Sequence, residues 1–534
     1  MSKKFEISLI FLFAIFAIYC SLSIGSSWDQ DFVMTRGEER LKYLLSFGVY
    51  SSDILWNRHT EDILPGFFAT FATLIKKMFP YKYEVESWHL INTTFSFLTF
   101  FGIYRITSIL FNKQVGKIVF LFCFLNPIFF GHMAINSKDT IVALSNVWAT
   151  YFFLKYITKQ NLKNNCYKYV FLFALALGLG AGTRVVFPAT LLPLLTFSLI
   201  DIFFLKKISN INFSFKKFIS HFAIVLVIAY FFVISCWPHV HSNIITGPFN
   251  KFLLSMNLEW MPWMLFDGAF YSTDKLPLSY LFVSFFYKSP EFILATLVIS
   301  FYLLAFKRDF FIKNFNNFWI KISLVLLIIL FPAFFFIMQP YNIYDGIRLF
   351  LYVVPYYNII PALVIYYLIN NYRFIIAKTL LYFVSVLFVY YIYIFIIISP
   401  YHYTYLNIFT GKYSNAYEKF ENDYWATSTK ELINKIKKKS IFNNPSETIK
   451  ITFCGAPHSL VKDGLKSIKN LNYEEGDINS NDFEYVIMTN RAIFKDKEKY
   501  AKNVKTCFQK YQGKDLVAVK RNGLVLSILR KKNN

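Results

Sequence analysis

The sequence predicts a mainly α-helical fold, a polytopic membrane helix bundle with a small extracytoplasmic α/β domain at its C-terminal end. Of the 534 residues, 56% are hydrophobic and only 16% are charged, whereas a soluble chain carries nearer a quarter charged residues. Many apolar runs reach about 20 residues, which is enough to cross a hydrocarbon core of roughly 30 Å. Beyond about residue 400 the pattern changes to short alternating segments, which favour strands.

Hydropathy predicts about eleven membrane spans. The first follows Lys3 and Lys4, and we expect it to remain uncleaved because its apolar part is longer than the core of a signal peptide. The spans are expected near residues 6–25, 88–110, 116–131, 139–158, 168–182, 185–205, 219–237, 281–306, 319–338, 349–369 and 379–399.

The basic residues predict the orientation of these spans. Lys and Arg recur in alternate loops, which are therefore expected on the cytoplasmic side, and the remaining loops and the C-terminal tail on the outer side. The formal net charge of +24 comes mainly from these loops and the tail. We therefore expect membrane lipids, and no nucleic acid, among the partners.

Three parts follow from this pattern. Residues 1–400 form the predicted transmembrane domain, with a large first outer loop at 26–87. Residues 401–435 form a linking segment, and residues 436–534 the α/β domain. Within that domain "ETIKITFCGAP" and "FEYVIMTNR" alternate like strands, "SLVKDGLKSIKN" is typical of a helix, and Asn522-Gly523 predicts a hairpin turn.

Cys454 and Cys507 both fall in this polar domain. An oxidising compartment would allow them to form a disulfide. They could instead be two unrelated buried thiols, because sequence spacing does not show whether their Cα atoms come within about 7 Å. The sequence leaves both interpretations open.

Ionisable residues recur next to the spans on the predicted outer side. Asp29 and Asp31 follow the first span, and Asp139 opens the fourth. Any one of them could be a solvated loop end, but their recurrence across several loops favours one shared cleft, since ionisable groups at a membrane edge mark substrate sites. The cations expected at the same depth are Arg184, Lys288 and Arg348.

Carboxylates opposite cations beside lipid suit a phosphate-bearing lipid. Arg and Lys would hold the phosphate, and a carboxylate would accept a proton from an acceptor. The sequence has no Walker loop, GxSxG elbow or HExxH motif, so nucleotide hydrolysis, serine hydrolysis and zincin chemistry lack support. No metal site or cofactor is predicted, and a divalent cation is left open.

The order of these motifs resembles a known family. An acidic motif after the first span, an N-P…G-H…N-x-K-D stretch at the fourth, "GTR" before the sixth and "YDGIR" before the tenth are similar to motifs of the C-type, polyprenyl-phosphate-dependent glycosyltransferases. Within that family the chain resembles the bacterial branch related to protein O-mannosyltransferases and lipid A aminoarabinose transferases. Residues 399–432 look like that branch's segment between the last span and the outer domain. The resemblance covers most of residues 25–435.

This resemblance implies a C-type glycosyltransferase fold and roles for particular carboxylates. Asp29 matches the leading Asp of the acidic pair and would be the general base. The family's pair is usually Asp-Glu, whereas Gln30 follows here, which leaves open whether Asp31 supplies the missing carboxylate. Asp139 matches the second acidic position, although Asp is also favoured as a helix N-cap.

The resemblance also implies substrate-binding residues. His132, Asn136 and Lys138 match the motif that contains Asp139, although Lys138 could instead pair with Asp139 or extend to the interface. Arg184 could bind substrate or satisfy backbone carbonyls at a tight turn. The residues expected to hold the donor phosphate or shape its pocket are Lys288, Arg348, Tyr344 and Asp345.

The expected function is that of an integral-membrane inverting glycosyltransferase. It would move a hexose or pentose from a polyprenyl-phosphate-linked donor to a glycan, lipid or protein acceptor on the non-cytoplasmic face, and we expect it in a bacterial inner membrane with its C-terminal domain outside. Two alternatives compete: a flippase or transporter for lipid-linked sugars, and a non-catalytic subunit of envelope assembly. The sequence shows no paired halves of the kind common in transporters.

Overall fold

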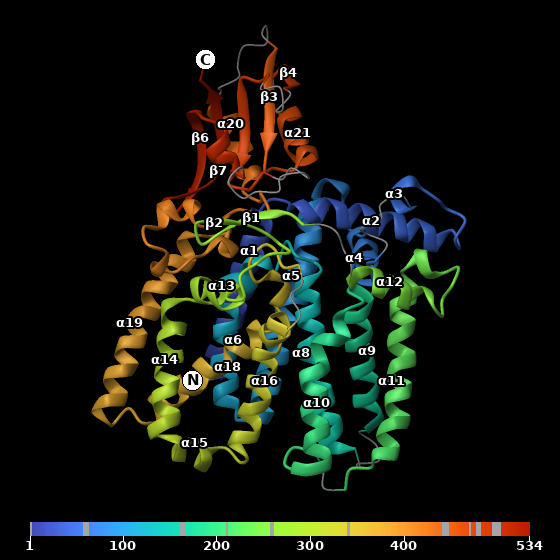
Figure 1. Cartoon of the computed structure of the whole chain (residues 1–534), viewed down its shortest axis with the longest axis vertical. Helices are drawn as coiled ribbons and strands as arrows, with labels where there is room; N and C mark the ends of the chain where they lie inside the picture. The colour runs from blue at the N-terminus through green and yellow to red at the C-terminus, as the bar shows by residue number, and fades with distance from the viewer. Residues whose placement is uncertain are drawn as a thin grey trace.

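Long apolar helices form a bundle that carries a small sheet at one end in the computed structural model (Figure 1). This confirms the predicted helical membrane fold with a C-terminal α/β region. The structure describes residues 3–56, 63–160, 166–209, 212–256, 261–338, 342–439, 448–468, 471–476, 482–493 and 504–533.

Seven helices in the described part of the chain are long and apolar enough to cross a membrane. An eighth span is a bent pair, α13 (Tyr280–Lys288) and α14 (Glu291–Phe306). The seven are α1 (Lys3–Ser23), α5 (Glu84–Leu110), α9 (Cys166–Thr183), α10 (Leu192–Ile200) with its flanking turns η2 (Phe187–Leu191) and η3 (Asp201–Leu205), α11 (Phe215–Ser235), α16 (Phe318–Met338) and α19 (Ile375–Ile397).

Two predicted spans are interrupted at proline. The predicted span 281–306 bends by 116° between α13 and α14, because Pro290 has no N–H to continue the hydrogen-bond ladder of α13. The predicted span 116–131 is replaced by α6 (Lys113–Phe124) and α7 (Pro127–His132). Asn126 caps α7, and its side chain accepts a hydrogen bond from the N–H of Phe129 at 3.1 Å.

The two remaining predicted spans, 139–158 and 349–369, are also helical. α8 (Asp139–Lys159) has the length of a span but is more polar. The span predicted at 349–369 is covered by η5 (Arg348–Phe350), α17 (Val354–Tyr357) and α18 (Ile359–Asn370). All eleven predicted segments are therefore helical, and the bundle is less regular than the hydropathy pattern suggested.

The predicted first outer loop is itself helical. α2 (Trp28–Leu45) lies across the end of the bundle that faces the sheet (Figure 1), and α4 (Phe67–Lys76) packs against it. A Cβ at Gly37 would lie 2.7 Å from the carbonyl oxygen of Ala69, so glycine allows this close approach. The loop also contains α3 (Asp53–Trp56) and η1 (Tyr81–Tyr83).

The remaining connections lie at the two ends of the bundle. α15 (Arg308–Asn314), which contains Arg308 and Lys313 of a predicted cytoplasmic loop, lies at the end opposite the sheet (Figure 1). The other elements are η4 (Pro238–Val240), α12 (Gly247–Met256), β1 (Trp263–Phe266) and β2 (Ala269–Ser272).

The C-terminal region contains a five-stranded mixed sheet in the order β4-β3-β5-β7-β6. In the predicted hairpin turn, Arg521 pairs with Leu524, and Asn522 and Gly523 have φ angles of 47° and 82°, as an Asn-Gly turn requires. The elements of the C-terminal region are β3 (Ile449–Cys454), α21 (His458–Lys466), β4 (Tyr473–Glu475), β5 (Tyr485–Thr489), α22 (Cys507–Lys510), β6 (Gly513–Arg521) and β7 (Leu524–Lys532).

Cys454 and Cys507, whose pairing the sequence left open, are joined by a disulfide. Their Cα atoms lie 5.8 Å apart. The bond connects the end of β3 to the start of α22, and so fixes the loops at one end of the sheet.

The predicted linking segment is a buried layer between bundle and sheet. It contains three short turns, η6 (His402–Thr404), η7 (Ile408–Thr410) and η8 (Tyr413–Glu418). α20 (Thr429–Lys439) crosses the predicted boundary at 435. Tyr403 and Trp425 are almost fully buried in this layer, which therefore holds the two parts together.

Candidate functional site

Four of the charged residues predicted to share a cleft, Asp29, Asp139, Arg184 and Arg348, form ion pairs at the end of the bundle beneath the C-terminal sheet. Asp29 lies in the first turn of α2, and Asp139 is the first residue of α8. A carboxylate is stabilised near a helix N-terminus by the helix dipole. Gly131 brings the 131–139 segment against the linking layer, because a Cβ there would lie 2.1 Å from the backbone nitrogen of Tyr403.

Asp29 lies between two cations. Its Oδ2 is 3.0 Å from Nζ of Lys138 and 3.3 Å from Nη1 of Arg348. Burial alone would raise the pKa of the Asp29 carboxyl, but the charges of Lys138 and Arg348 lower it below its ordinary value. Asp29 is therefore an ionised carboxylate at neutral pH.

Asp139 forms a second ion pair beside the first. Its Oδ1 lies 2.7 Å from Nη2 of Arg184, and its Oδ2 accepts a hydrogen bond from Nδ2 of Asn136 at 2.9 Å. The N-cap position of α8 is held by Lys138, not by Asp139. Lys138 pairs with Asp29, as described above, and Arg184 pairs with the Asp139 carboxylate.

Arg348 is the most buried cation of the site, with 4% of its side chain exposed. Its guanidinium carbon lies 4.5 Å from the ring centre of Tyr344 and 4.8 Å from that of Trp425, and such cation–π contacts fix its position. Its Nε lies 3.4 Å from Oδ2 of Asp345. Indole Nε1 of Trp425 donates to the same oxygen at 3.2 Å.

His132 packs behind this cluster. Its Nε2 shares a hydrogen bond of 2.9 Å with the Tyr424 hydroxyl, and its Nδ1 lies 3.5 Å from Nδ2 of Asn136. The ring is fully buried and contacts the Trp425 ring edge-on. His132 thus supports Asn136 and Trp425, which in turn contact Asp139 and Asp345.

Asp31 lies apart from the cluster, on the outer face of α2. Residues two apart on a helix point about 200° away from each other. The exposed Asp31 carboxylate accepts a hydrogen bond from Ser459 of α21 at 3.3 Å. Gln30, which stands where the family pattern has Glu, is buried and bonds to Nε2 of His89 at 2.7 Å.

Lys288 lines a separate small cavity. Its Nζ donates to the carbonyl oxygen of Tyr403 at 3.0 Å. The cavity, of about 40 Å³, is shared with Asp345, Glu421 and Tyr424. Lys288 is therefore linked to Arg348 through Asp345, which lines the same cavity and pairs with Arg348.

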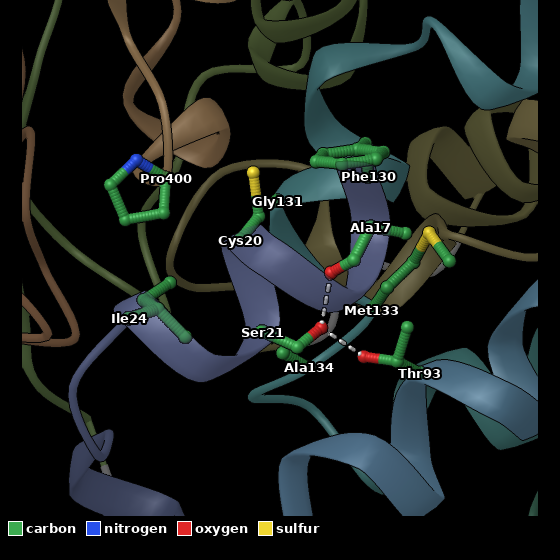
Figure 2. Close-up of a pocket in the computed structure, with 10 residues that line it drawn as sticks. All are labelled: Ala17, Cys20, Ser21, Ile24, Thr93, Phe130, Gly131, Met133, Ala134 and Pro400. Atoms are coloured by element: carbon green, nitrogen blue, oxygen red, sulfur yellow. Dashed lines mark hydrogen bonds between the residues drawn. The ribbon is translucent and has the colours of Figure 1, made fainter. Parts of the chain in front are cut away.

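A second cavity lies between α1, α5 and the 130–134 segment (Figure 2). Figure 2 shows Ser21 on its wall, with its hydroxyl bonded to the carbonyl oxygen of Ala17 and to Thr93. The other lining groups are mostly apolar, and the cavity measures about 10 Å³. Both cavities are far below the few hundred Å³ of a ligand pocket, and neither is lined by Asp29, Asp139 or Arg348.

Three residues of the site were not predicted from the sequence. Nη2 of Arg491, in the C-terminal domain, lies 3.4 Å from Oδ1 of Asp345. Trp425 covers Arg348, and Glu421 lines the cavity beside Lys288. Trp425 and Glu421 lie in the stretch 399–432, whose resemblance to the family was their only signal.

No cluster of three or more His, Cys, Asp or Glu side chains suited to a metal ion occurs among the described residues. In the part of the chain that the structure shows, the carboxylates Asp29, Asp139 and Asp345 each face a cation instead. The arrangement can hold an anion on its cations and place a carboxylate next to it.

No family model and no curated protein sequence matches the chain. Solved structures match it in fold. ArnT from Cupriavidus metallidurans bound to undecaprenyl phosphate aligns with a TM-score of 0.51 at 11% identity, over 99% of this chain and 98% of that one. The archaeal oligosaccharyltransferase AglB from Archaeoglobus fulgidus, in complex with an inhibitory peptide and a dolichol-phosphate, aligns with a TM-score of 0.50 at 11% identity, over 91% and 69% of the two chains. The chain thus has the fold of the C-type membrane glycosyltransferases, as its motifs predicted.

Proposed function

We propose that this protein is an integral-membrane glycosyltransferase that moves a sugar from a polyprenyl-phosphate-linked donor to an acceptor on the non-cytoplasmic face. The observation that carries the proposal is the contact between Asp29 and Arg348, a buried guanidinium paired with a partly exposed carboxylate at the predicted membrane edge. It lies in a fold shared with ArnT bound to undecaprenyl phosphate. A guanidinium suits a phosphate at such an edge, and a carboxylate suits proton acceptance.

In the proposed reaction the acceptor hydroxyl attacks the anomeric carbon of the donor sugar. Asp29 takes the hydroxyl proton, the bond between the anomeric carbon and the phosphate oxygen breaks, and the polyprenyl phosphate leaves with the electron pair. Attack from the side opposite the phosphate inverts the anomeric centre. Arg348 stabilises the charge on the leaving phosphate.

The ion pairs also suggest how the base is activated. Lys138 and Arg348 lower the pKa of Asp29, which makes it a weak base. A donor phosphate that engages Arg348 would share the charge of that guanidinium. The pKa of Asp29 would then rise toward its ordinary value, so donor binding would prepare the base.

Asp139 and Arg184 have a supporting role in this proposal. Arg184 pairs with Asp139 at 2.7 Å, and its charge also acts on Asp29. The pair keeps a second carboxylate beside Asp29, where it can orient the acceptor. Lys288, which shares a cavity with Asp345, would donate a hydrogen bond on the phosphate side.

The activity is tested with purified full-length protein, polyprenyl-phosphate sugars labelled in the sugar and an envelope extract as acceptor source. Transfer of label that depends on Asp29 is the expected result. In the same preparation, movement of the labelled lipid between leaflets without transfer would indicate a flippase. A protein that binds a partner but neither transfers nor moves the lipid would be an assembly subunit.

The proposed sidedness places the C-terminal domain outside the cytoplasm. Its support is the disulfide between Cys454 and Cys507, since such bonds persist in oxidising compartments. The exposed residues Asn415, near the sheet, and Asn316, next to α15, lie in predicted outer and inner segments. Single cysteines at these two positions should react with a membrane-impermeant thiol reagent from opposite sides, and reaction from the same side would overturn the topology.

A further inference from the structure

A loop of the C-terminal domain reaches the charged cluster. It consists of residues 490–493, directly after β5. Nδ2 of Asn490 donates to the carbonyl oxygen of Tyr417 at 2.7 Å, and the N–H of Ala492 donates to Oε1 of Glu421 at 2.6 Å. The guanidinium of Arg491, between them, donates to the carbonyl oxygen of Tyr424. Three successive residues are thus bound to the linking layer.

The same loop is fixed from the side of its own domain. The N–H of Cys507 donates to the carbonyl oxygen of Arg491 at 2.9 Å, and the N–H of Ile493 donates to that of Lys505 at 2.9 Å. Cys507 is held by its disulfide to Cys454. A Cβ at Gly455 would lie 3.0 Å from Cβ of Arg491. The backbone of Arg491 therefore has one well-defined position, which is what a binding residue needs.

The side chain of Arg491 faces Arg348 across one carboxylate. Nη2 of Arg491 lies 3.4 Å from Oδ1 of Asp345, and Nε of Arg348 lies 3.4 Å from Oδ2. Two guanidinium groups placed on the two oxygens of a single anion are arranged as they would be around a phosphate, which offers more oxygens of the same kind. Arg491 is the outer of the two, with 22% of its side chain exposed against 4% for Arg348.

We propose that Arg491 is a second anion-binding residue, which together with Arg348 holds the phosphate of the lipid-linked donor. The inference rests on the proposed function and deepens it, because the C-terminal domain then supplies part of the donor site. Asp345 keeps the two guanidiniums together before the donor arrives. Each guanidinium has five N–H donors. Arg491 uses Nη2 on Asp345 and Nη1 on the carbonyl oxygen of Tyr424, and Arg348 uses Nε on Asp345 and Nη1 on Asp29, so each group keeps further N–H donors for a second anion.

A residue that merely docks the domain provides the control. Arg521 also joins the C-terminal domain to the layer below it. Its Nε donates to the carbonyl oxygen of Ser399 at 2.8 Å, its Nη1 donates to Oε1 of Glu431 at 3.2 Å, and it stacks on Tyr401. Arg521 has the same chemistry as Arg491 but belongs to a different set of ion pairs.

The experiment measures binding of undecaprenyl phosphate, and of uncharged undecaprenol, to full-length protein in nanodiscs. For the phosphate, Arg491→Ala should weaken binding about tenfold or more, as expected for loss of a charge-assisted contact, and Arg491→Lys should restore it partly. Arg521→Ala should bind like wild type. Binding of undecaprenol should be the same in all four proteins.

The possible failures are distinct. Wild-type protein that does not prefer the phosphate to undecaprenol would overturn the proposed function and the inference with it. Wild-type protein that does prefer it, with Arg491→Ala binding equally well, would overturn the inference alone. An equal loss in Arg491→Ala and Arg521→Ala would show that Arg491 acts only by docking the domain, which also overturns it.

Discussion

Two networks of ion pairs begin on the same helix, α2, and differ in their balance of charge. Near its N-terminal end, Asp29 belongs to the charged cluster of the proposed donor site, called the donor cluster below. There the cations Lys138, Arg184, Arg348 and Arg491 face the carboxylates Asp29, Asp139 and Asp345.

Further along α2, Glu38 belongs to the second network, the Lys76 clamp. Lys76 of α4 pairs with Glu38 at 2.5 Å and also with Glu84 at the start of α5. In this network one buried cation serves two carboxylates, so it has no spare positive charge. The donor cluster has cations in excess and suits an anionic ligand, whereas the clamp suits only the joining of three helices.

The largest effect on transfer is expected from a substitution of Asp29. Asp29→Asn should lower transfer by about 10²–10⁴-fold, because an amide cannot accept the proton of the acceptor. The labelled-sugar transfer assay measures the rate. Asp31→Asn is the matched control, since its carboxylate lies on the outer face of α2 against Ser459, and it should remain near wild type. Full activity of Asp29→Asn would move the base elsewhere, Asp139 being the nearest alternative.

A smaller effect on transfer is expected at Arg348, the most buried cation of the cluster. Arg348→Ala should reduce transfer at limiting donor about 100-fold, from loss of charge-assisted contacts to the phosphate, and Arg348→Lys should recover only part of it because a Lys lacks the planar fork. The dependence of rate on donor concentration is the measurement. Arg373→Ala, an exposed arginine of a predicted inner loop, is the control. Equal effects at both positions would contradict a specific donor site.

A substitution in the Lys76 clamp should lower stability and leave transfer nearly unchanged, the opposite of what we expect for Asp29 and Arg348. Lys76→Met leaves the partly exposed carboxylates of Glu38 and Glu84 without their shared buried cation, and loss of such a cation is destabilising. We expect the Tm of the purified protein to fall by about 5 °C, with transfer per folded molecule within about twofold of wild type. Lys77→Met, at the exposed neighbouring position, should change neither. A loss of transfer without a loss of stability would make the clamp part of the active site.

The comparison also shows what could be predicted from the sequence. The helical segments of the bundle were predictable because apolar runs are local signals, although among the described residues only seven helices, or eight spans with the bent pair, are long and apolar enough to cross a membrane. The dipeptide Asn126-Pro127 is a local signal for the break between α6 and α7, although hydropathy alone predicted a single span there. The sheet and its hairpin were predictable from alternation and an Asn-Gly turn.

The partners within the site were harder to predict. Lys138 is adjacent to Asp139 but pairs with Asp29, because only the fold decides which carboxylate a side chain meets. Arg491 follows strand β5 in another domain, and nothing in "TNRAI" points to a membrane site. Such contacts between distant segments have no local sequence pattern.

The smallest expected effect concerns Glu421, which sets the charge at the edge of the donor cluster. Burial raises the pKa of Glu421 to about 7, although the nearby charge of Arg491 opposes the shift and Asp345 adds to it. An acid whose pKa is higher in the folded protein than in the unfolded chain stabilises the fold while it is protonated. That contribution is complete below the ordinary pKa of 4.5 and is lost as the pH rises through about 7.

Glu421→Gln keeps a neutral side chain at all of these pH values. Relative to this variant, the Tm of the wild type should therefore fall as the pH rises from about 4.5 to above 7, the two pKa values that bound the change. Ionisation of Glu421 would also place a fourth carboxylate beside Arg491 and Lys288, which share its surroundings, and cancel the excess positive charge of the cluster. Binding of undecaprenyl phosphate by the wild type should then weaken severalfold over the same range, whereas the Gln variant should lose less. Parallel pH profiles for the two proteins would show that Glu421 does not titrate there, and that the charge excess is set by the three aspartates alone.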